Sequence, residues 1–263
     1  MPLSAYQIVA TLGPASQDPE TWTQMAAAGA SGFRLNTSHL TLENLERWLG
    51  RYQAFLRTAE YCLPLVLDLQ GSKWRLGSFS PFELVPGEMV RLVQASQTAH
   101  PGELPVPHPD FFAAAAVSSG EVNLNDAKVR LEITAMQDGL AYARTTLGGP
   151  VQANKGITLP ASPYRVEQLN AKDLAILERT RGLEWVRYAI SYLRDGEEMA
   201  RYRALFGASA HLIAKLERQP ALDDARAVAL HASELWLCRG DLGAELGLPA
   251  MAAEAHRFSS RVE

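Results

Sequence analysis

The chain has 263 residues, of which 47% are hydrophobic and 21% charged, a composition typical of an ordinary globular protein. Its formal net charge of -4 gives no general attraction to nucleic acid or to an acidic membrane surface. No segment approaches the roughly 18 uninterrupted apolar residues of a spanning helix, and the first residues lack a basic leader followed by an apolar run. We therefore expect small anions as ligands, with no nucleic-acid partner and no membrane association.

Cys62 and Cys238 are the only cysteines, and each lies in an apolar stretch that is typical of a buried strand or of the approach to one. Two separated thiols of this kind fit a reducing compartment and no disulfide framework. We therefore expect a cytoplasmic protein.

Short apolar runs rich in Val, Ile and Leu alternate with longer segments of helical spacing, a pattern that predicts buried parallel strands followed by helices. In the first part of the chain, Asp18 is expected to open a helix that Gly29 ends, and Ser38 or Thr41 can cap the next helix. The strands expected here are 6–12, 32–35 and 63–69.

The pattern changes from residue 70 to about residue 153, where turn residues are frequent and polar residues alternate with apolar ones. Residues 128–133 and 140–144 are expected to form two strands, with a tight hairpin turn at Asp138 and Gly139. We interpret 70–153 as a small β domain, a lid, inserted in an α/β frame.

From residue 154 the alternation of strands and helices resumes, so the barrel is expected in two parts, residues 1–69 and 154–263. Together they hold six βα units and fall short of the roughly 200 residues that a closed eight-stranded barrel needs. The predicted fold class is α/β, an incomplete TIM-type (β/α) barrel with an inserted small β-barrel lid domain. The later strands are expected at 185–191, 211–217 and 235–238, and the helices at 171–181, 197–206, 221–231 and 249–262.

Residues that a core would not choose follow several strands, at the edge where a parallel barrel gathers its functional groups. Lys215 and Glu217 point the same way because side chains alternate along a strand, and Asp241 follows the next strand. Two carboxylates suit Mg²⁺, and a nearby lysine can stabilise an enolate or phosphoryl oxygen. Gly240 lets backbone amides approach an anion where the next helix starts.

A rim salt bridge is at least as good an explanation for any one of these residues, but their occurrence at successive strand ends favours a functional site. His39 is weaker, since a single histidine after a strand more often caps or packs. Trp74, Trp185 and Trp236 are interpreted as packing residues.

Six motifs follow one another between residues 7 and 247 and resemble, in order, those of the pyruvate kinase family. Their order, with a β lid between the third and fourth strands, is far more specific than any single motif. They are IVATLGPAS, RLNTSH, LDLQGSKWR, NKGITLP, AKLE and RGDLGAE.

The resemblance implies Mg²⁺-dependent (or Mn²⁺-dependent) phosphoryl transfer from phosphoenolpyruvate to ADP, giving pyruvate and ATP, in a full-length form that is a homo-oligomer. Glu217 and Asp241 would hold the metal, Lys215 and Arg34 would be catalytic, and the amides of Gly240 and Asp241 would take the substrate carboxylate. Several cations must surround the phosphates. The residues implied for this are Arg34, Arg75, Lys155 and His39.

The chain departs from the family's usual motifs at several positions. Leu69 and Lys73 replace the threonine and the glutamate of the third motif, and Leu40 stands where the family has glycine. The lid's usual Asp-Asp-Gly reads Asn125-Asp126-Ala127. The family also continues into two further strands and a regulatory domain, which this sequence does not include.

In the family a monovalent cation is held by counterparts of Asn36, Ser38, Asp68 and the threonine that Leu69 replaces. Here that site has lost a ligand, and Lys73 adds an ammonium close to it. A fixed ammonium can neutralise the phosphates as a bound K⁺ would. We therefore predict an enzyme that does not need potassium.

Two alternative functions stay open. A Mg²⁺-dependent lyase or aldolase on a related barrel would use the same enolate stabilisation, but it has little use for Arg75, Lys155 and a lid together. A non-catalytic relative that binds phosphoenolpyruvate and regulates a partner is favoured by the changes at Leu40 and Leu69.

Overall fold

The structure is a computed structural model, and it describes residues 7–59, 62–118, 120–125, 127–137, 139–160 and 169–260. These residues form two compact units. The first unit takes in the described residues up to Gly71, those from 169 to Lys215, and Asp224–Trp236. The second takes in those from Ser72 to 160, Leu216–Asp223, and those from Leu237 to 260.

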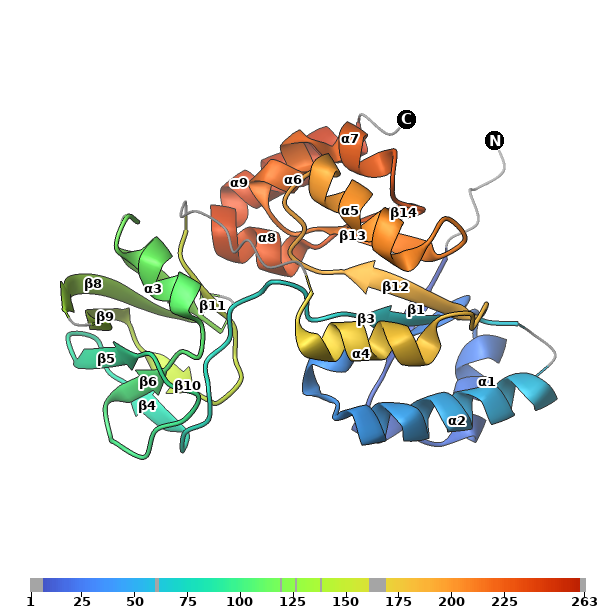
Figure 1. Cartoon of the computed structure of the whole chain (residues 1–263), viewed down its shortest axis with the longest axis horizontal. Helices are drawn as coiled ribbons and strands as arrows, with labels where there is room; N and C mark the ends of the chain where they lie inside the picture. The colour runs from blue at the N-terminus through green and yellow to red at the C-terminus, as the bar shows by residue number, and fades with distance from the viewer. Residues whose placement is uncertain are drawn as a thin grey trace. The chain divides into compact units, whose positions relative to one another are not determined.

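A six-stranded parallel sheet lies at the centre of the first unit, in the order β1-β2-β3-β12-β13-β14 (Figure 1). Strand order follows chain order, as successive right-handed βα units require. This confirms the prediction of an incomplete α/β barrel with six strands. The strands are β1 (Val9–Leu12), β2 (Gly32–Asn36), β3 (Leu65–Asp68), β12 (Val186–Ile190), β13 (His211–Leu216) and β14 (Glu234–Leu237).

The helices of the first unit begin at polar caps. Asp18 accepts a hydrogen bond from the Glu20 N–H at 3.0 Å, as predicted, and Thr41, not Ser38, accepts from the Asn44 N–H at 3.1 Å. Ser38 lies instead in a short 3₁₀ turn. These elements are η1 (Pro14–Ser16), α1 (Pro19–Ala27), η2 (Thr37–His39), α2 (Leu42–Thr58), α4 (Ala171–Thr180), α5 (Gly196–Phe206) and α7 (Ala225–Ala229).

Aromatic side chains fill the layer between α1, α2 and the sheet. Trp22, Phe33 and Tyr52 are fully buried, and Trp22 meets Phe55 edge to face with 5.5 Å between ring centroids. Tyr52 donates to the Leu63 carbonyl at 2.9 Å, and burial raises the pKa of its hydroxyl. This layer fixes the helices against the sheet.

The opposite, inner face of the sheet has a small apolar centre of Val66, Ala189 and Ile213, against which the partly buried Val9 and Trp236 pack. Val9 and Trp236 come from β1 and β14, the two ends of the sheet. The prediction that Trp236 is a packing residue is confirmed. The same prediction is confirmed for the other two tryptophans. The ring of Trp185 lies 5.4 Å from that of Tyr52, and Trp74 lies in the core of the second unit.

The second unit contains a separate strand-rich sheet, in the order β11-β7-β8-β9-β5-β6, and a two-stranded sheet of β10 and β4. The predicted hairpin is confirmed as the antiparallel pair β8 and β9, although Asp138 lies outside the described residues. Beyond residue 153, β11 still pairs with β7. The strands are β4 (Phe82–Leu84), β5 (Met89–Val93), β6 (Glu103–Pro105), β7 (Glu121–Leu124), β8 (Val129–Gln137), β9 (Leu140–Leu147), β10 (Gly149–Val151) and β11 (Ile157–Thr158).

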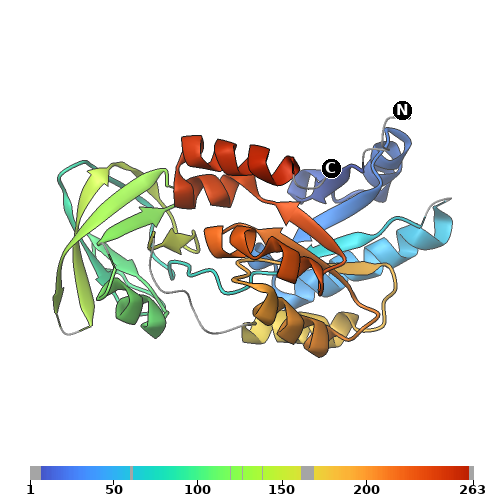
Figure 2. The ribbon, with the colours of Figure 1, turned by 90° about the horizontal axis from the view of Figure 1, so that it is seen from above.

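The helices of the second unit were only partly predicted. Helix α3 (Pro109–Ala115), which packs beside β9 (Figure 2), was missed because it is short and lies among turn residues. Helix α8 (Arg239–Leu246) begins where a helix start was expected, at Gly240, but its range was not predicted, because its glycines lower its helix propensity. The predicted helix 221–231 is divided into α6 (Gln219–Asp223) and α7, and α9 (Leu248–Ser259) matches the last predicted helix.

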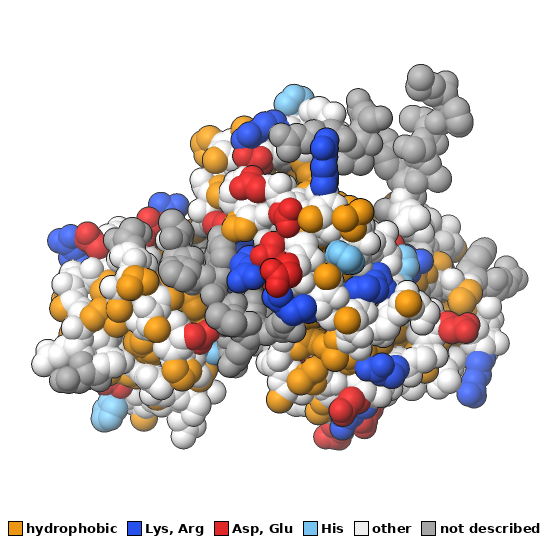
Figure 3. All heavy atoms as spheres, turned by 45° about the horizontal axis from the view of Figure 1, so that its top comes forward, with side chains coloured by type: hydrophobic (Ala, Val, Ile, Leu, Met, Phe, Trp, Pro, Cys, Tyr) orange, Lys and Arg blue, Asp and Glu red, His pale blue; other side chains and the backbone are white. Residues whose placement is uncertain are grey.

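Both cysteines are free, but Cys62 is exposed and Cys238 only half-buried. Cys62 shortly precedes β3 and Cys238 directly follows β14, so each lies beside a strand, as predicted. On the face drawn in Figure 3, acidic and basic side chains of the described residues lie close to one another, not in separate patches. Among the described residues, no helix is both long enough and apolar enough to cross a membrane.

Candidate active site

A buried carboxylate, Asp68, organises the charged cluster of the first unit. It is 3% exposed at the end of β3 and receives two cations. Arg34 donates to Asp68 Oδ2 from Nε at 2.8 Å and from a terminal nitrogen, and Lys215 Nζ lies 3.1 Å from Oδ1. The structure thus brings together three residues that the sequence placed at separate strand ends. Because Asp68 is paired, both cations have fixed positions.

Ser191 completes this cluster. Its hydroxyl accepts from Lys215 Nζ at 3.0 Å and donates to Asp68 Oδ1 at 3.0 Å. It follows β12, between the strands that carry Asp68 and Lys215. Ser191 ends the predicted strand 185–191, and no role was predicted for it from the sequence. The signal was available, since Ser191 is a polar residue at a strand end like the others.

The turn after β2 holds the predicted cation ligands Asn36 and Ser38. The Asn36 side chain accepts from the Ser38 N–H at 3.0 Å and so caps η2. Lys172 Nζ lies 2.6 Å from the Thr37 carbonyl oxygen and 3.2 Å from that of Ser38. A lysine that the sequence analysis did not select therefore binds this turn. His39 ends η2, and its side chain lies outside the described residues.

Asp173 is a second buried carboxylate that the sequence analysis missed. It is fully buried in α4 and accepts from the Gly71 N–H at 2.9 Å and the Gln70 N–H at 3.2 Å. Burial raises the pKa of its carboxyl to about 6, against the lowering effect of those N–H groups. A lone acidic residue in the first turn of a helix gave no sequence signal, because such residues are usually solvated.

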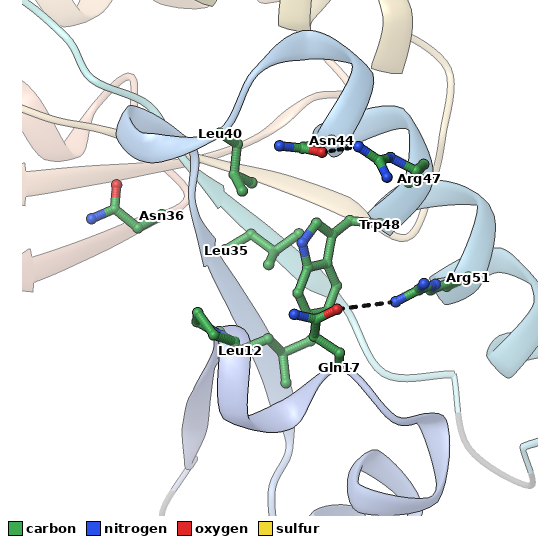
Figure 4. A pocket seen from close by; sticks show the side chains of 11 residues that line it. Leu12, Gln17, Leu35, Asn36, Leu40, Asn44, Arg47, Trp48 and Arg51 are labelled. Atoms are coloured by element: carbon green, nitrogen blue, oxygen red, sulfur yellow. Dashed lines mark hydrogen bonds between the residues drawn. The ribbon is translucent and has the colours of Figure 1, made fainter.

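A cavity of about 370 Å³ lies beside the ends of β1 and β2 in the first unit (Figure 4). Its apolar wall includes Leu12, Leu35 and Trp48. Two guanidinium groups lie at its edge, where Arg51 donates to Gln17 at 3.5 Å and Arg47 donates to Asn44. The remaining lining residues are Gly13, Pro14, Asn36 and Leu40. Cavities with apolar walls and a few polar groups are suited to small organic ligands.

In the second unit, Lys73 and Asp241 form an ion pair with 2.5 Å between Nζ and Oδ1. The two side chains are 12% and 26% exposed. Asp241 and Gly240 lie in the first turn of α8, whose N–H groups have no acceptor within the helix. The lysine that replaces the family's glutamate thus contacts one of the predicted metal ligands.

Glu217 follows β13 directly and is 1% exposed, and its neighbour Arg218 is 2% exposed. The Gln219 N–H donates to Glu245 of α8 at 3.1 Å. Carboxylates such as Glu217 and Asp241 are the donors that Mg²⁺ prefers, with water and substrate oxygens completing the shell, so these residues fit the implied metal. Within the described ranges, no three acidic, histidine or cysteine side chains form a metal-binding group by themselves.

Two predicted phosphate-binding residues lie near each other in the strand-rich part of the second unit. The backbone of Arg75 forms an isolated antiparallel β-bridge with Gly156. The Arg75 guanidinium donates to the Asn154 carbonyl at 3.0 Å. The Lys155 carbonyl accepts from the Leu76 N–H at 2.9 Å. The motifs LDLQGSKWR and NKGITLP are therefore joined through backbone contacts.

The parallel βα sheet of the first unit and the inserted strand-rich sheet of the second place the chain among the α/β barrel proteins. A family model for the barrel domain of pyruvate kinase matches residues 3–262. The chain belongs to the pyruvate kinase family, as its motifs predicted.

Curated relatives agree with this assignment. A pyruvate kinase of Methylorubrum extorquens is 32% identical over 246 residues, covering 92% of this chain and 51% of the relative. One from Agrobacterium vitis is 30% identical (91% and 50%), and one from Mycobacterium tuberculosis is 30% identical (92% and 52%). The chain therefore spans about half the length of these relatives.

Proposed function

We propose that this chain carries the site of a pyruvate kinase-like phosphotransferase, which converts phosphoenolpyruvate and ADP to pyruvate and ATP. The main support is the pair of cations, Arg34 and Lys215, that Asp68 fixes at the strand ends of the first unit. Phosphoryl transfer depends on such fixed positive charge, because the transferring group and the enolate oxygen are both anionic. Lys215 would stabilise the enolate oxygen, and Arg34 would bind the phosphate.

Glu217 and Asp241 would hold Mg²⁺ or Mn²⁺. The ion, when bound, supplies charge neutralisation and orientation for the phosphoryl oxygens. The first-turn amides of α8, those of Gly240 and Asp241, would bind the substrate carboxylate, since a helix N-terminus favours an anion.

For the nucleotide, Arg75, Lys155 and His39 would bind the phosphates. The cavity beside β1 and β2 would take the base, since its wall of Leu12, Leu35 and Trp48 offers apolar contact. The cytoplasmic location and the homo-oligomeric full-length form stay predictions.

The proposal is tested by Glu217→Gln and Asp241→Asn, each measured for phosphoryl transfer in this chain and in a version extended to a complete barrel. Both variants should lose most activity while keeping the far-ultraviolet spectrum of the parent. Glu245→Gln is the matched control, since it is a carboxylate of α8 that accepts from the Gln219 N–H. Activity within about tenfold of the parent, a barrier change of ~1.4 kcal/mol, would exclude these carboxylates from the mechanism.

We further propose that the enzyme does not need potassium. The support is Leu69, a buried apolar side chain that cannot act as a cation ligand where the family has threonine. The ammonium of Lys73 forms an ion pair with Asp241. Activity is compared with and without KCl in sodium-free buffer, at an ionic strength held constant with a bulky organic cation. A flat response that becomes potassium-dependent in the Lys73→Glu, Leu69→Thr double variant supports the proposal, whereas strong activation of the parent by KCl contradicts it.

A further inference from the structure

Asp173 binds the chain at the point where β3 has ended and the second unit is about to begin. Its two oxygens accept from successive peptide N–H groups, those of Gln70 and Gly71. Asn170, the cap of α4, holds the carboxylate in place by donating to Oδ2 at 3.1 Å. A fully buried carboxylate that accepts three hydrogen bonds fixes the backbone that it binds.

Gly71 transmits this restraint to the charged cluster. Its φ is +63°, and a Cβ added to it would lie 2.1 Å from the Ser191 carbonyl oxygen. Only glycine permits so close an approach. Ser191 is the residue whose hydroxyl contacts both Lys215 and Asp68, so the Gly71 backbone lies directly against the residue that holds the reacting lysine.

We propose that Asp173 is a positioning residue, which fixes the 70–71 peptide units against Ser191 and thereby sets the position of the Lys215 ammonium. The inference rests on the proposed function of Lys215, because it assigns to Asp173 an effect on that group. Asp173 itself contacts neither Lys215 nor Asp68 through a hydrogen bond, so its effect passes through the backbone and Ser191.

The charge of Asp173 supports this role. Its pKa is raised to about 6, chiefly by burial and in smaller part by the Asp68 charge, against the lowering effects of the Gly71 and Gln70 N–H groups and of Lys172. Burial and the neighbouring Glu198 raise the pKa of the Tyr202 hydroxyl in α5, and the charge of Asp173 adds to this in smaller part. Near neutral pH the ionised carboxylate offers an acceptor to both N–H groups, and protonation turns one acceptor position into a donor.

The test uses Asp173→Asn, which keeps the side-chain shape but replaces one acceptor oxygen with an NH₂ donor. Asp224→Asn is the matched control, because Asp224 also accepts from a backbone N–H, that of Gly196 at 2.8 Å, but has no contact with the 70–71 turn. Ser191→Ala removes the hydroxyl that contacts Lys215 without altering a charge. It is the variant to measure if Asp173→Asn folds poorly.

The first two measurements need no turnover. Hydrogen exchange by mass spectrometry should show the Gln70 and Gly71 amides exchanging at least about tenfold faster in Asp173→Asn and unchanged in Asp224→Asn. Amine labelling at one fixed pH should modify Lys215 faster in Ser191→Ala and Asp173→Asn than in the parent, and at the parent rate in Asp224→Asn, since the ammonium has lost a positioned acceptor. Unchanged exchange and labelling would overturn the inference.

Turnover of phosphoenolpyruvate gives the third measurement. A misplaced reacting group lowers kcat by about 10- to 100-fold, and we expect KM to change less than threefold. The fall in parent activity between pH 7 and pH 5 should be weaker in Asp173→Asn. Equal losses in kcat for Asp173→Asn and Asp224→Asn would mean that Asp173 is merely structural. If the parent shows no turnover, the proposed function fails, while exchange and labelling still decide the positioning role.

Discussion

The strand-rich sheet and the parallel sheet bury their residues in different ways. In the strand-rich part of the second unit, side chains such as Leu92, Leu104 and Leu131 are fully buried in one apolar core. The parallel sheet buries its helix-covered side as completely, but its inner face has only the small centre of Val66, Ala189 and Ile213. A mainly antiparallel sheet with its own helix can complete a core, whereas a parallel barrel sheet completes its inner core only by closing on itself.

The inner face of the parallel sheet is also charged at both ends of its strands. At their starts, Glu234 pairs with Arg187 at 2.9 Å and with His211 at 2.7 Å. At their far ends, Asp68 pairs with Lys215. Paired charges tolerate partial burial but contribute little to stability. We therefore expect the second unit to have the higher free energy of unfolding, and the charged residues of the first unit lie on the face with the smaller apolar core.

The largest expected effect concerns the ends of the parallel sheet. Within the described residues, β1 and β14 each have one neighbouring strand, so each presents an unpaired edge. We expect the chain to dimerise, aggregate or unfold readily, as measured by sedimentation and by urea unfolding. A cooperative, well-folded monomer at high concentration would contradict this prediction.

The next largest expected effect is on the free energy of unfolding, which truncation of an apolar side chain should lower more in the second unit than in the first. Leu131→Ala should cost the second unit about 2–5 kcal/mol, because the leucine is fully buried. Trp236→Ala should cost the first unit no more than about 2 kcal/mol, because the tryptophan is half-buried at an edge strand. Hydrogen exchange of core amides measures the unfolding free energy of each unit separately in the same protein. Equal costs for the two variants would contradict the difference in stability between the units.

A third test uses the buried Asp173, which affects only the first unit. Burial raises its folded-state pKa to about 6, above the ordinary value of 3.8, so the folded state binds the proton more tightly. Its contribution to stability is fully present below pH 3.8 and is lost as the pH rises through 6. The loss is about 3 kcal/mol at most.

Asp173→Asn removes this titration. The variant should therefore be most destabilised near pH 4, and its deficit relative to the parent should shrink towards pH 7. Chemical unfolding of both proteins across this range measures the difference. A deficit independent of pH would show that Asp173 does not titrate in this interval.

The smallest expected effect lies in the second unit. Ala127 has a φ of +61°, a left-handed conformation that costs an alanine roughly 1 kcal/mol. Because the family has glycine here, Ala127→Gly should raise the stability of the strand-rich part by up to about 1 kcal/mol. The matched change Ala135→Gly, in β8, should lower it. Thermal unfolding measures both, and a loss of stability in Ala127→Gly would contradict the strain argument.

The sequence by itself determined the strands, most helices and the family. Strand positions followed from apolar runs of the right length, and the cap at Asp18 from the local sequence, whereas the choice of Thr41 over Ser38 came from the structure. These signals are local, so no tertiary knowledge was needed. The polar residues at strand ends likewise identified Arg34, Asp68 and Lys215, because parallel strands all end at one edge.

Only the tertiary structure decided which of these groups meet. Asp173 and Gly71 are 102 residues apart, and Lys73 and Asp241 are 168 apart, so no local pattern announces either contact. The close approach of Gly71 to Ser191 depends on how two strand ends pack. Glycine is required at position 71 because of this packing, which cannot be read from the sequence. The partners of a buried charge are set by long-range packing, because a carboxylate can leave water only where the folded chain supplies donors to it.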